Sequence, residues 1–326
     1  MTAERCLVLG GSGFLGSHLV ELLLAEGFSV RVFGLGFPSS TSVGALPQLE
    51  VVDDDFRDPK ALANSVEGCQ YVFHLISTTV PASSNRDMLF DLETNLLGTV
   101  RLLEICVRER VRQIIFSSSG GTVYGATGNS PIPETHPTEP RSAYGITKLG
   151  IEKYLALFHV LHGLEYTILR IGNAYGPRLP LTGEQGVVGA FLKCLSGGEP
   201  IRLWGDGSVT RDYVYATDVA RAFRMALEQR SQFRIFNIGT GTGTSISELI
   251  RLMEKATGRQ ARILTERGRP ADVPVNILDP TRARQYLNWE ANTALQTGLV
   301  NTWNWLRASE TQRLTPGARE LKTSAS

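Results

Sequence analysis

The stretch "LVLGGSGFLGSH" (7–18) connects an apolar run to a segment of helical periodicity through a glycine-rich turn. Gly10, Gly13 and Gly16 fit the spacing G-x-x-G-x-x-G, and Gly11, Gly13 and Gly16 fit G-x-G-x-x-G. Glycines at these positions allow a tight turn, a close approach to a pyrophosphate and close packing of helix on strand. The N-terminus of the helix that follows offers free N–H groups and a positive dipole end to phosphates. The stretch therefore predicts a dinucleotide-binding turn.

The sequence after this turn alternates between two kinds of segment. Apolar runs of strand type lie at 5–11, 29–34, 50–56, 70–77 and 113–119, and helical patterns lie at 13–27, 58–68, 87–111 and 142–163. Strands that are apolar throughout and alternate with helices indicate a parallel sheet covered on both faces.

The texture of the chain changes after "EYTILRIGNAYGP" (165–177), where the elements become shorter and the turns more polar. We therefore expect an α/β fold, with a Rossmann-like doubly wound parallel sheet over 1–177 and a smaller mixed α/β substrate-binding lobe over 178–308. Residues 201–240 are expected to contribute to both lobes. The end of the chain, 309–326, lacks periodicity and is predicted to be a disordered tail.

Composition limits the classes of function. The chain has 326 residues, 42% of them hydrophobic, and a net charge of +1, which gives no indication of a nucleic-acid or membrane surface. Cys6, Cys69, Cys106 and Cys194 are scattered without any CxxC, so we expect neither a metal site nor a disulfide framework. Glycines interrupt the apolar N-terminus and no apolar run is long enough to span a bilayer, so we expect a cytoplasmic protein.

The fifth predicted strand ends in serines, and a tyrosine and a lysine follow four residues apart in the next predicted helix. Ligands of a doubly wound sheet lie at the carboxyl ends of its strands, where Ser117, Ser118 and Ser119 are expected. Tyr144 and Lys148 share one helix face, and a cation beside a phenol lowers the pKa of that phenol. Such a phenol exchanges the proton of a substrate hydroxyl while a hydride moves, and a serine hydroxyl bridges the two. A Tyr–Lys pair is also a common surface arrangement, but the glycine-rich turn and the serines favour catalysis.

The residues that select the cofactor are less clear. An acidic residue usually ends the second strand and binds the ribose 2′-hydroxyl of NAD, but Gly34 stands there. No arginine follows at once to bind a 2′-phosphate, and the hydroxyls of 39–42 are an alternative, so NAD and NADP both stay open. Asp55 and Phe56, at the end of the third predicted strand, are candidates to hold the adenine, and an ordinary turn at the strand end is an equally good interpretation.

The chain resembles the extended short-chain dehydrogenases/reductases of the NAD-dependent nucleotide-sugar epimerase/dehydratase kind, over about residues 5–306. The motifs that carry the resemblance are "GGSGFLGSH", "DDDFRD", "FHLIS", "TNLLGTVRLLE", "FSSSGGTVYG", "YGITK", "LRIGNAYGPR", "GDGSVTRDYVYATDVA", "FNIGTG" and "RPADV". Together they are specific for the superfamily and less specific for one reaction.

The resemblance implies a role for each matching residue. Tyr144 would be the catalytic base, Lys148 would bind the nicotinamide ribose, and Ser119 would be the catalytic hydroxyl, with Ser118 and Thr122 as alternatives. The cofactor would contact Gly10, Gly13, Phe14, Leu15, Gly16, Asp55, Phe56, Leu75, Asn95, Ser117, Tyr144 and Lys148. The nucleotide sugar would contact Ser119, Tyr144, Asn173, Arg211, Arg269 and Asp272. A guanidinium suits a diphosphate, which supports the two arginines, although each is also compatible with a surface salt bridge.

The segment before "VYG" bears on the reaction. Members that dehydrate or decarboxylate resemble one another in carrying an acid there, whereas this chain has "SGGT" (119–122). We therefore expect NAD-dependent C4 epimerisation of a UDP-hexose or UDP-N-acetylhexosamine through a 4-keto intermediate, in a chain most similar to UDP-glucose 4-epimerases. Gly34, and Thr79 in place of a lysine that such epimerases often carry, keep open an NADPH-dependent reductase of a 4-keto nucleotide sugar. A non-catalytic dinucleotide sensor is the alternative from another class. Asn276 stands where the family's gate for N-acetyl groups is expected, and its medium size fits either sugar.

The helices at 87–111 and 142–163 carry apolar residues on more than one face, namely Leu149, Leu155, Leu157 and Phe158 with Leu92, Leu96 and Leu103. Relatives commonly dimerise through this helix pair as a four-helix bundle. The resemblance therefore implies a homodimer.

Overall fold

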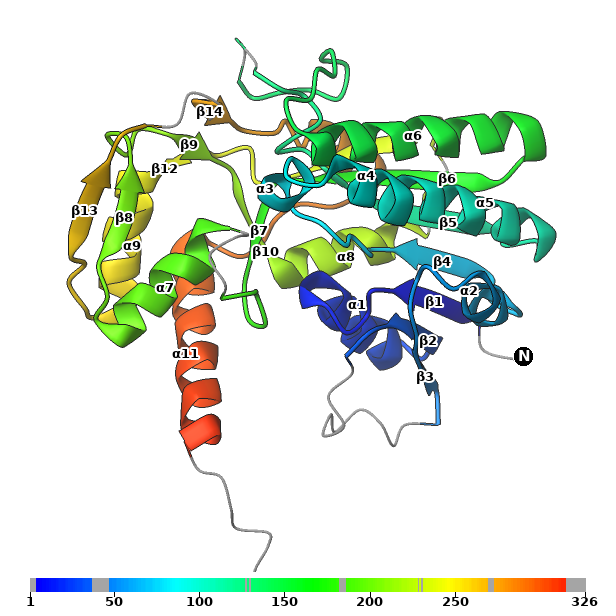
Figure 1. Cartoon of the computed structure of the whole chain (residues 1–326), viewed down its shortest axis with the longest axis horizontal. Coiled ribbons are helices and arrows are strands. Elements are labelled where there is room, and N and C mark those ends of the chain that lie inside the picture. Colours follow the sequence, from blue (N-terminus) through cyan, green and yellow to red (C-terminus); the bar gives the residue numbers. More distant parts are fainter. Residues whose placement is uncertain are drawn as a thin grey trace, which may run out of the picture.

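The centre of the molecule is a seven-stranded parallel sheet with the strand order β11-β6-β5-β4-β1-β2-β3 (Figure 1). The structure is a computed structural model, and it describes residues 4–36, 47–126, 128, 130–181, 186–227, 229, 231–268 and 273–314. The strands of this sheet are β1 (Arg5–Leu9), β2 (Ser29–Gly34), β3 (Leu49–Asp53), β4 (Tyr71–His74), β5 (Gln113–Ser119), β6 (Glu165–Ile171) and β11 (Ile235–Ile238). The chain order reverses between β1 and β4, so the crevice that binds ligands in such sheets lies at the carboxyl ends of these two strands.

Helices cover both faces of this sheet because successive side chains of each buried strand point to opposite sides. Cys6 and Val8 belong to the core under α1 (Phe14–Ala25) and α8 (Ala216–Ala226), whereas Leu7 and Leu9 belong to the opposite core. That second core lies under α2 (Pro59–Val66), α5 (Gly98–Arg108) and α6 (Ala143–His162). The Rossmann-like α/β fold predicted from the sequence is confirmed.

The prediction of one helix over 87–111 is wrong in one respect, because three consecutive elements form in this range. A short helix α4 (Met88–Asp91) leads into a π-helical turn η1 (Leu92–Leu97), and only then into α5. The hydroxyls of Thr94 and Thr99 donate to the carbonyls of Phe90 and Asn95, four residues earlier, at 2.6 Å each. Such bonds compete with the regular helical ladder, and π-helical turns often mark functional sites.

A smaller lobe follows, built from short sheets and three further helices. Its strands are β7 (Asn173–Tyr175), β8 (Ile201–Trp204), β9 (Thr210–Arg211), β10 (Tyr213–Tyr215), β12 (Thr244–Ser245), β13 (Ile263–Glu266) and β14 (Val275–Asn276). The helices α7 (Val187–Gly197), α9 (Ile246–Thr257) and α11 (Leu295–Leu314) share one apolar core with β8 and β10, and α3 (Pro81–Ser84) and α10 (Thr281–Tyr286) lie outside it. Within the segment 201–240, β11 is a strand of the large sheet and α8 packs on one face of that sheet. The strands β8 and β9 of the same segment belong to small sheets. The division at residue 178 stays a proposal.

The C-terminal helix is longer than the sequence indicated. A disordered tail is predicted from 309, but α11 continues to Leu314. The hydroxyl of Ser196 on α7 donates to the carboxylate of Glu310 at 2.7 Å, and Arg307 pairs with the same carboxylate at 3.0 Å. These contacts hold the last turns of the helix on the lobe, and 315–326 lie outside the described residues.

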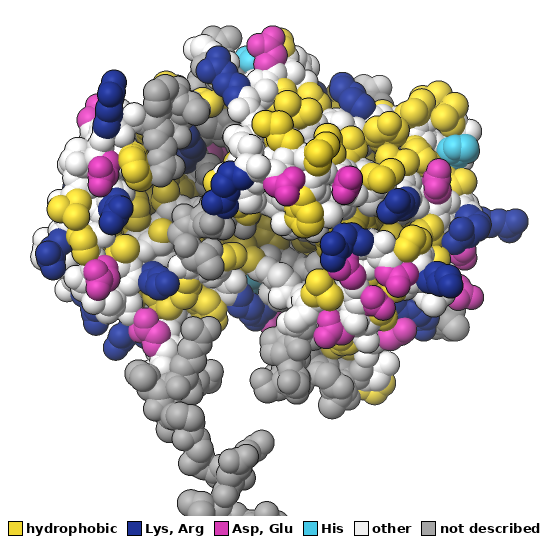
Figure 2. Space-filling view, in the orientation of Figure 1, with side chains coloured by type: hydrophobic (Ala, Val, Ile, Leu, Met, Phe, Trp, Pro, Cys, Tyr) yellow, Lys and Arg dark blue, Asp and Glu magenta, His cyan; other side chains and the backbone are white. Residues whose placement is uncertain are grey.

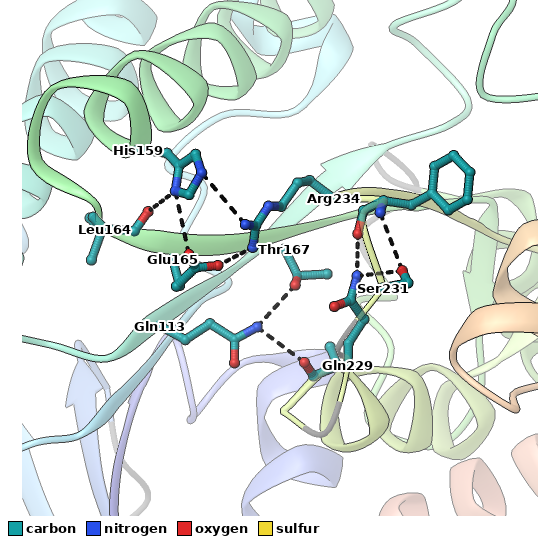
Figure 3. Close-up of polar contacts among 10 residues, drawn as sticks. Gln113, His159, Leu164, Glu165, Thr167, Gln229, Ser231 and Arg234 are labelled. Carbon is teal, nitrogen blue, oxygen red and sulfur yellow. Dashed lines mark hydrogen bonds and ion pairs between the residues drawn. The ribbon is translucent and has the colours of Figure 1, made fainter.

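Polar contacts connect the amino-terminal ends of strands β5 and β6 with neighbouring segments (Figure 3). The glycine-rich turn lies at the opposite ends of the strands, after β1. The side chain of Gln113 donates to the hydroxyl of Thr167 at 3.0 Å and to the carbonyl of Ala226 at 3.1 Å. Beside them, Arg234 donates to the carboxylate of Glu165, the first residue of β6. These bonds join β5, β6, α8 and the start of β11 at the edge that carries no candidate site residue.

An apolar face extends over α4, η1 and α6, and Figure 2 shows hydrophobic side chains gathered there. Its exposed residues are Met88, Leu89, Phe90, Leu92, Leu97, Ile146, Tyr154, Leu157, Val160 and Leu161. The residues named from the sequence are only partly correct, since Leu103, Leu155 and Phe158 are buried in the chain's own core. The face itself has no covering element among the described residues.

Candidate active site

The glycine-rich turn joins β1 to α1 and leaves no room for larger residues. A Cβ at Gly16 would lie 2.1 Å from the carbonyl oxygen of Gly10, and one at Gly10 would lie 3.2 Å from the backbone of Ile76. Gly10 also has a φ of +84°, which favours glycine. Phe14 and Leu15 form the first turn of α1, where N–H groups have no intrahelical partner. The turn thus fits the pyrophosphate of a dinucleotide.

The outer end of this crevice brings Gly34 and Asp53 together. Gly34 has a φ of +152°, and a Cβ there would point toward Ser12 and Gly10 at 3.7–3.9 Å. Asp53 ends β3 directly beside Gly34 in the strand register, and its carboxylate accepts a hydrogen bond from the N–H of Gly36 at 3.1 Å. An exposed carboxylate therefore lies next to the place where the acid of β2 is missing, which sequence reasoning did not find.

Asp55 and Phe56 differ in how they lie. The carboxylate of Asp55 pairs with Arg57 at 2.6 Å, and hydrogen bonds from this arginine lower the pKa of Asp55. The ring of Phe56 is buried in the core, 5.4 Å from the ring of His74 and against Gly98. Because the Phe56 ring is buried, its backbone and the carboxylate of Asp55 are the groups of this pair that are available to an adenine, and the adenine contact stays a prediction.

The three serines of β5 point in alternate directions. The hydroxyl of Ser118 is buried and donates to Glu152 at 2.6 Å, and Glu152 forms a buried ion pair with Arg170 at 2.6 Å. Ser119 ends the strand at the crevice, half-buried, and its direction is opposite to that of Ser118. The hydroxyl of Ser118 is therefore engaged by Glu152 of α6. The hydroxyl oxygen of Thr122 is buried without a hydrogen-bond partner among the described residues, so it stays an alternative to Ser119.

Tyr144 and Lys148 lie on one face of α6, one turn apart. Ser142 caps this helix, and the hydroxyl of Ser84 on α3 accepts a hydrogen bond from the N–H of Tyr144 at 3.0 Å. The Nζ of Lys148 donates to the carbonyl of Ser117 at 3.0 Å and lies 5.5 Å from the centre of the Tyr144 ring. The predicted Tyr and Lys thus share one face of α6, and Lys148 contacts the end of β5 at Ser117, two residues before Ser119.

The charge states of this pair correct one expectation. Burial lowers the pKa of Lys148 to about 8, against the raising effects of Asp91 and Glu152. Burial also raises the pKa of Tyr144 to about 12, although a hydrogen bond with Ser77 lowers it. The sequence argument expected Lys148 to lower the pKa of Tyr144. Burial instead raises the pKa of Tyr144 more than the Ser77 hydrogen bond lowers it, and the ammonium of Lys148 donates to the carbonyl of Ser117.

Asn95 lies behind the crevice rather than in it. Its side-chain oxygen accepts from the N–H of Thr78 at 2.9 Å, and its amide donates to the Asp91 carboxylate at 3.0 Å and to the Thr79 hydroxyl at 3.2 Å. Asn95 is buried, so it shapes the loop after β4, which begins at Leu75 beside the glycine-rich turn. Asp91 was missed, and its only signal in the sequence is a helical spacing of four from Asn95.

A second hollow, of about 520 Å³, opens in the smaller lobe. It is lined by polar and aromatic groups that include Asn173, Arg202, Trp204, Arg211 and Tyr213. The side-chain nitrogen of Asn173 and the hydroxyl of Tyr213 are buried there without a hydrogen-bond partner among the described residues. Buried polar atoms of this kind call for a partner, such as a water molecule or a polar ligand.

Other predicted substrate residues are placed in part. One Nη of Arg211 donates to the carbonyls of Thr210 and Val273 at 2.9 and 2.7 Å, which holds the guanidinium at the hollow. Arg269 and Asp272 lie outside the described residues. Asn276 is 1% exposed and donates to the carbonyl of Gly120 at 3.2 Å, one residue after Ser119.

The described ranges bring together no group of three His, Cys, Asp or Glu side chains suited to binding a metal ion. Within the same ranges, none of the helices has the length and apolar character needed to cross a membrane.

Comparison with known proteins identifies relatives over almost the whole chain. Residues 6–239 match the NAD dependent epimerase/dehydratase family. A UDP-glucose 4-epimerase of Mycolicibacterium smegmatis is 35% identical over 312 residues, which cover 93% of this chain and 98% of the relative. The structure of a UDP-glucose 4-epimerase from Thermotoga maritima with UDP-glucose superposes with a TM-score of 0.87 at 38% identity, covering 94% of this chain and 99% of the other. One from Thermus thermophilus in complex with NAD gives 0.85 at 33%, with 94% and 99% covered.

Proposed function

We propose, from the premise that the chain belongs to the NAD dependent epimerase/dehydratase family, that it inverts C4 of a UDP-hexose or UDP-N-acetylhexosamine. The family and its relatives make the chain an NAD-dependent isomerase acting on a UDP-sugar, as predicted. The choice of sugar and the role of each residue are the proposal. The observation that carries it is the placement of Tyr144 and Lys148 on one face of α6, with the ammonium of Lys148 on the carbonyl of Ser117, two residues before Ser119 at the end of β5.

The residues present fit NAD. The turn around Gly10, which any Cβ at Gly16 would obstruct, admits a pyrophosphate, and the N–H groups at the start of α1 bind it. Asp53 supplies a carboxylate beside Gly34 for the ribose hydroxyls. The same carboxylate repels a 2′-phosphate, which supports NAD over NADP. Held at this turn, NAD would supply reversible hydride transfer at C4 of the sugar.

In this proposal Tyr144 moves the proton of the sugar's O4. The phenolate takes this proton as C4 is oxidised. It gives the proton back after the 4-keto sugar has rotated to present its other face. Ser119 donates a hydrogen bond to the same oxygen, where negative charge develops. Lys148 binds the nicotinamide ribose and keeps a cation within 5.5 Å of the Tyr144 ring. Because the protein alone raises the pKa of Tyr144 to about 12, the positive charge of the oxidised cofactor is needed to make phenolate accessible.

The hollow of the smaller lobe holds the nucleotide. The guanidinium of Arg211, fixed by two carbonyls, binds the diphosphate, and Asn173 and Tyr213 offer buried polar atoms to the ligand. Arg269 and Asp272, which lie outside the described residues, are proposed from the family resemblance to contact the nucleotide. A nucleotide anchored outside the crevice leaves the sugar free to rotate, which epimerisation requires.

A reductase of a 4-keto nucleotide sugar is the second candidate. Thr79, which stands where relatives often have a lysine, points to Asp91 and gives the cofactor no cation. This favours a loosely held cofactor, whereas Asp53 opposes a phosphorylated one. The non-catalytic sensor has no support from the site, because Tyr144, Lys148 and Ser119 are all at the crevice.

The assembly we propose is a homodimer through the apolar face over α4, η1 and α6. Pairing of two such faces would bury its exposed leucines and aromatics as a bundle of four helices. The cytoplasmic location also stays a proposal, and it is supported by four free cysteines.

The test is incubation of the purified protein with UDP-glucose, UDP-galactose and their N-acetyl forms, without added cofactor, and proton NMR of the C4 configuration. Interconversion supports an epimerase with resident NAD. Failure to convert any of them, with NAD supplied, together with oxidation of NADPH by 4-keto nucleotide sugars, would favour the reductase.

A further inference from the structure

Asp91, at the end of α4, is a carboxylate buried between the loop after β4, η1 and α6. Asp91 is 0% exposed. One of its oxygens accepts hydrogen bonds from the amide of Asn95 at 3.0 Å and from the hydroxyl of Thr79, and the other accepts from the hydroxyl of Thr147 at 2.5 Å. All three donors are neutral, and no Lys, Arg or His among the described residues forms an ion pair with it. A buried charge held in this way is costly unless it interacts with charge farther away.

The segments that Asp91 joins are those that form the site. Thr147 lies on α6, directly before Lys148 and one turn from Tyr144. Thr79 belongs to the loop after β4, which also carries Ser77, the hydrogen-bond partner of Tyr144. The bond to Thr147 therefore fixes how the helix of the proton-transferring pair sits against the loop of the cofactor crevice.

Among the charged and titratable groups around Lys148, Asp91 is the carboxylate for which no ion pair is found among the described residues. Glu152, on the same helix, is neutralised by Arg170 of β6 in a buried pair. His74 of β4 is neutral, since burial lowers its pKa to about 3. β5 contributes the Ser117 carbonyl and the ring of Phe116, 4.8 Å from the ammonium.

We propose that Asp91 is a positioning residue for proton transfer, which holds α6 against the loop 77–80 through Thr147 and supplies the negative charge that faces Tyr144 and Lys148. The proposal rests on the proposed function, because it assigns Asp91 to the step that Tyr144 carries out. Asp91 is fully buried, so in this proposal it acts through the residues that it holds.

The charge and the hydrogen bond have separate consequences. The carboxylate raises the pKa of both Lys148 and Tyr144, so removing its charge lowers both. Activity needs Tyr144 able to accept a proton and Lys148 protonated, so both limbs of the pH profile of kcat move to lower pH in Asp91→Asn. The expected shift is about one pH unit. Asp91→Glu retains the charge and should leave the limbs near their wild-type positions.

The hydrogen bond is tested by the matched pair Thr147→Val and Thr147→Ser. Valine removes the hydroxyl and keeps the charge of Asp91, so kcat should fall about tenfold, with KM and the pH limbs little changed. Serine keeps the hydroxyl and should restore kcat. A wild-type kcat in the valine variant would overturn the positioning role, even if Asp91→Asn did not fold.

A readout without turnover separates this inference from the proposed function. NMR of isotope-labelled lysine side chains, with Lys148 assigned from Lys148→Arg, follows the titration of this ammonium directly. We expect a pKa near 8 in the wild type, a value about one unit lower in Asp91→Asn and no change in Thr147→Val. An unchanged titration in a folded Asp91→Asn variant would overturn the inference, whereas inactivity of the wild type toward UDP-sugars would overturn the function alone.

Discussion

The ammonium of Lys148 donates its hydrogen bond to the carbonyl of Ser117, 3.0 Å away, and thereby fastens α6 to the end of β5. The lysine is 4% exposed, so a cation is kept in a desolvated place at the crevice. Burial brings its pKa down to about 8. The geometry of the pair and its pH dependence thus have one origin.

Lys148 predicts opposite pH dependences of activity and stability. Activity should fall above about pH 8, as the ammonium loses its proton. The folded pKa lies below the ordinary 10.5, so between these values the unfolded chain binds more protons, and this group's contribution to the free energy of unfolding rises with pH. Urea unfolding of wild type and Lys148→Met measures this. The stability advantage of the methionine variant at pH 7 should shrink toward pH 10, and a constant difference would contradict the prediction.

Ser118 and Ser119 are adjacent but should behave differently when changed to alanine. Ser118→Ala leaves Glu152 short of one buried donor, so it should cost roughly 1–3 kcal/mol of stability with kcat within about twofold. Ser119→Ala should lower kcat on the order of 100-fold and leave stability unchanged. Thermal unfolding and initial rates on both variants give the comparison. Loss of activity in Ser118→Ala alone would reverse the assignment, and loss in neither would turn attention to Thr122.

Asp53 is predicted to discriminate between NAD and NADP. Asp53→Ser removes the carboxylate beside Gly34 and should raise affinity for NADPH by about tenfold. Asp54→Ser is the matched control, because the Asp54 carboxylate accepts from the N–H of Asp55 at 2.7 Å and should not affect the ratio. Fluorescence titration with NADH and NADPH measures both affinities. If the ratio of the NADH and NADPH affinities is the same in the wild type and in Asp53→Ser, Asp53 does not contact the ribose.

The apolar face over α4, η1 and α6 predicts how assembly can be broken. Leu157 is 45% exposed in the middle of α6. The variant Leu157→Glu should be a folded monomer, because it would place negative charges between the two paired faces. Leu264→Glu on β13 is the control, since that leucine is also exposed but lies in the other lobe. Light scattering at micromolar concentration should find a dimer for the wild type and the control. A monomeric wild type would refute the homodimer.

Sequence patterns predicted those features that depend on local spacing. Gly10, Gly13 and Gly16 are fixed by the sterics of one turn, and Tyr144 and Lys148 share a face because four residues make about one helical turn. Alternation along β5 separates Ser118 from Ser119, once the strand is placed. The parallel sheet followed from apolar strands alternating with helices.

Features that depend on distant contacts could not be read in this way. Asp91 acquires its role from Thr79 and Thr147, which are 12 and 56 residues away. The burial of Phe56 depends on Gly98 and His74, and the π-helical turn depends on threonine hydroxyls that compete with the helix. The raised pKa of Tyr144 reflects desolvation, which no spacing reveals. The end of α11 is held by Ser196 from another helix.

The central claim is that hydride leaves C4 of the sugar and returns to the same carbon on the other face, with Tyr144 moving the proton. The most direct measurement uses UDP-glucose carrying deuterium at C4, incubated with the protein in ordinary water and followed by NMR and mass spectrometry. We predict UDP-galactose that retains deuterium at C4, and loss of this conversion by at least about 1,000-fold in Tyr144→Phe, which should still bind NAD. Inversion with deuterium exchanged for solvent hydrogen, or a Tyr144→Phe variant as active as the wild type, would contradict the account.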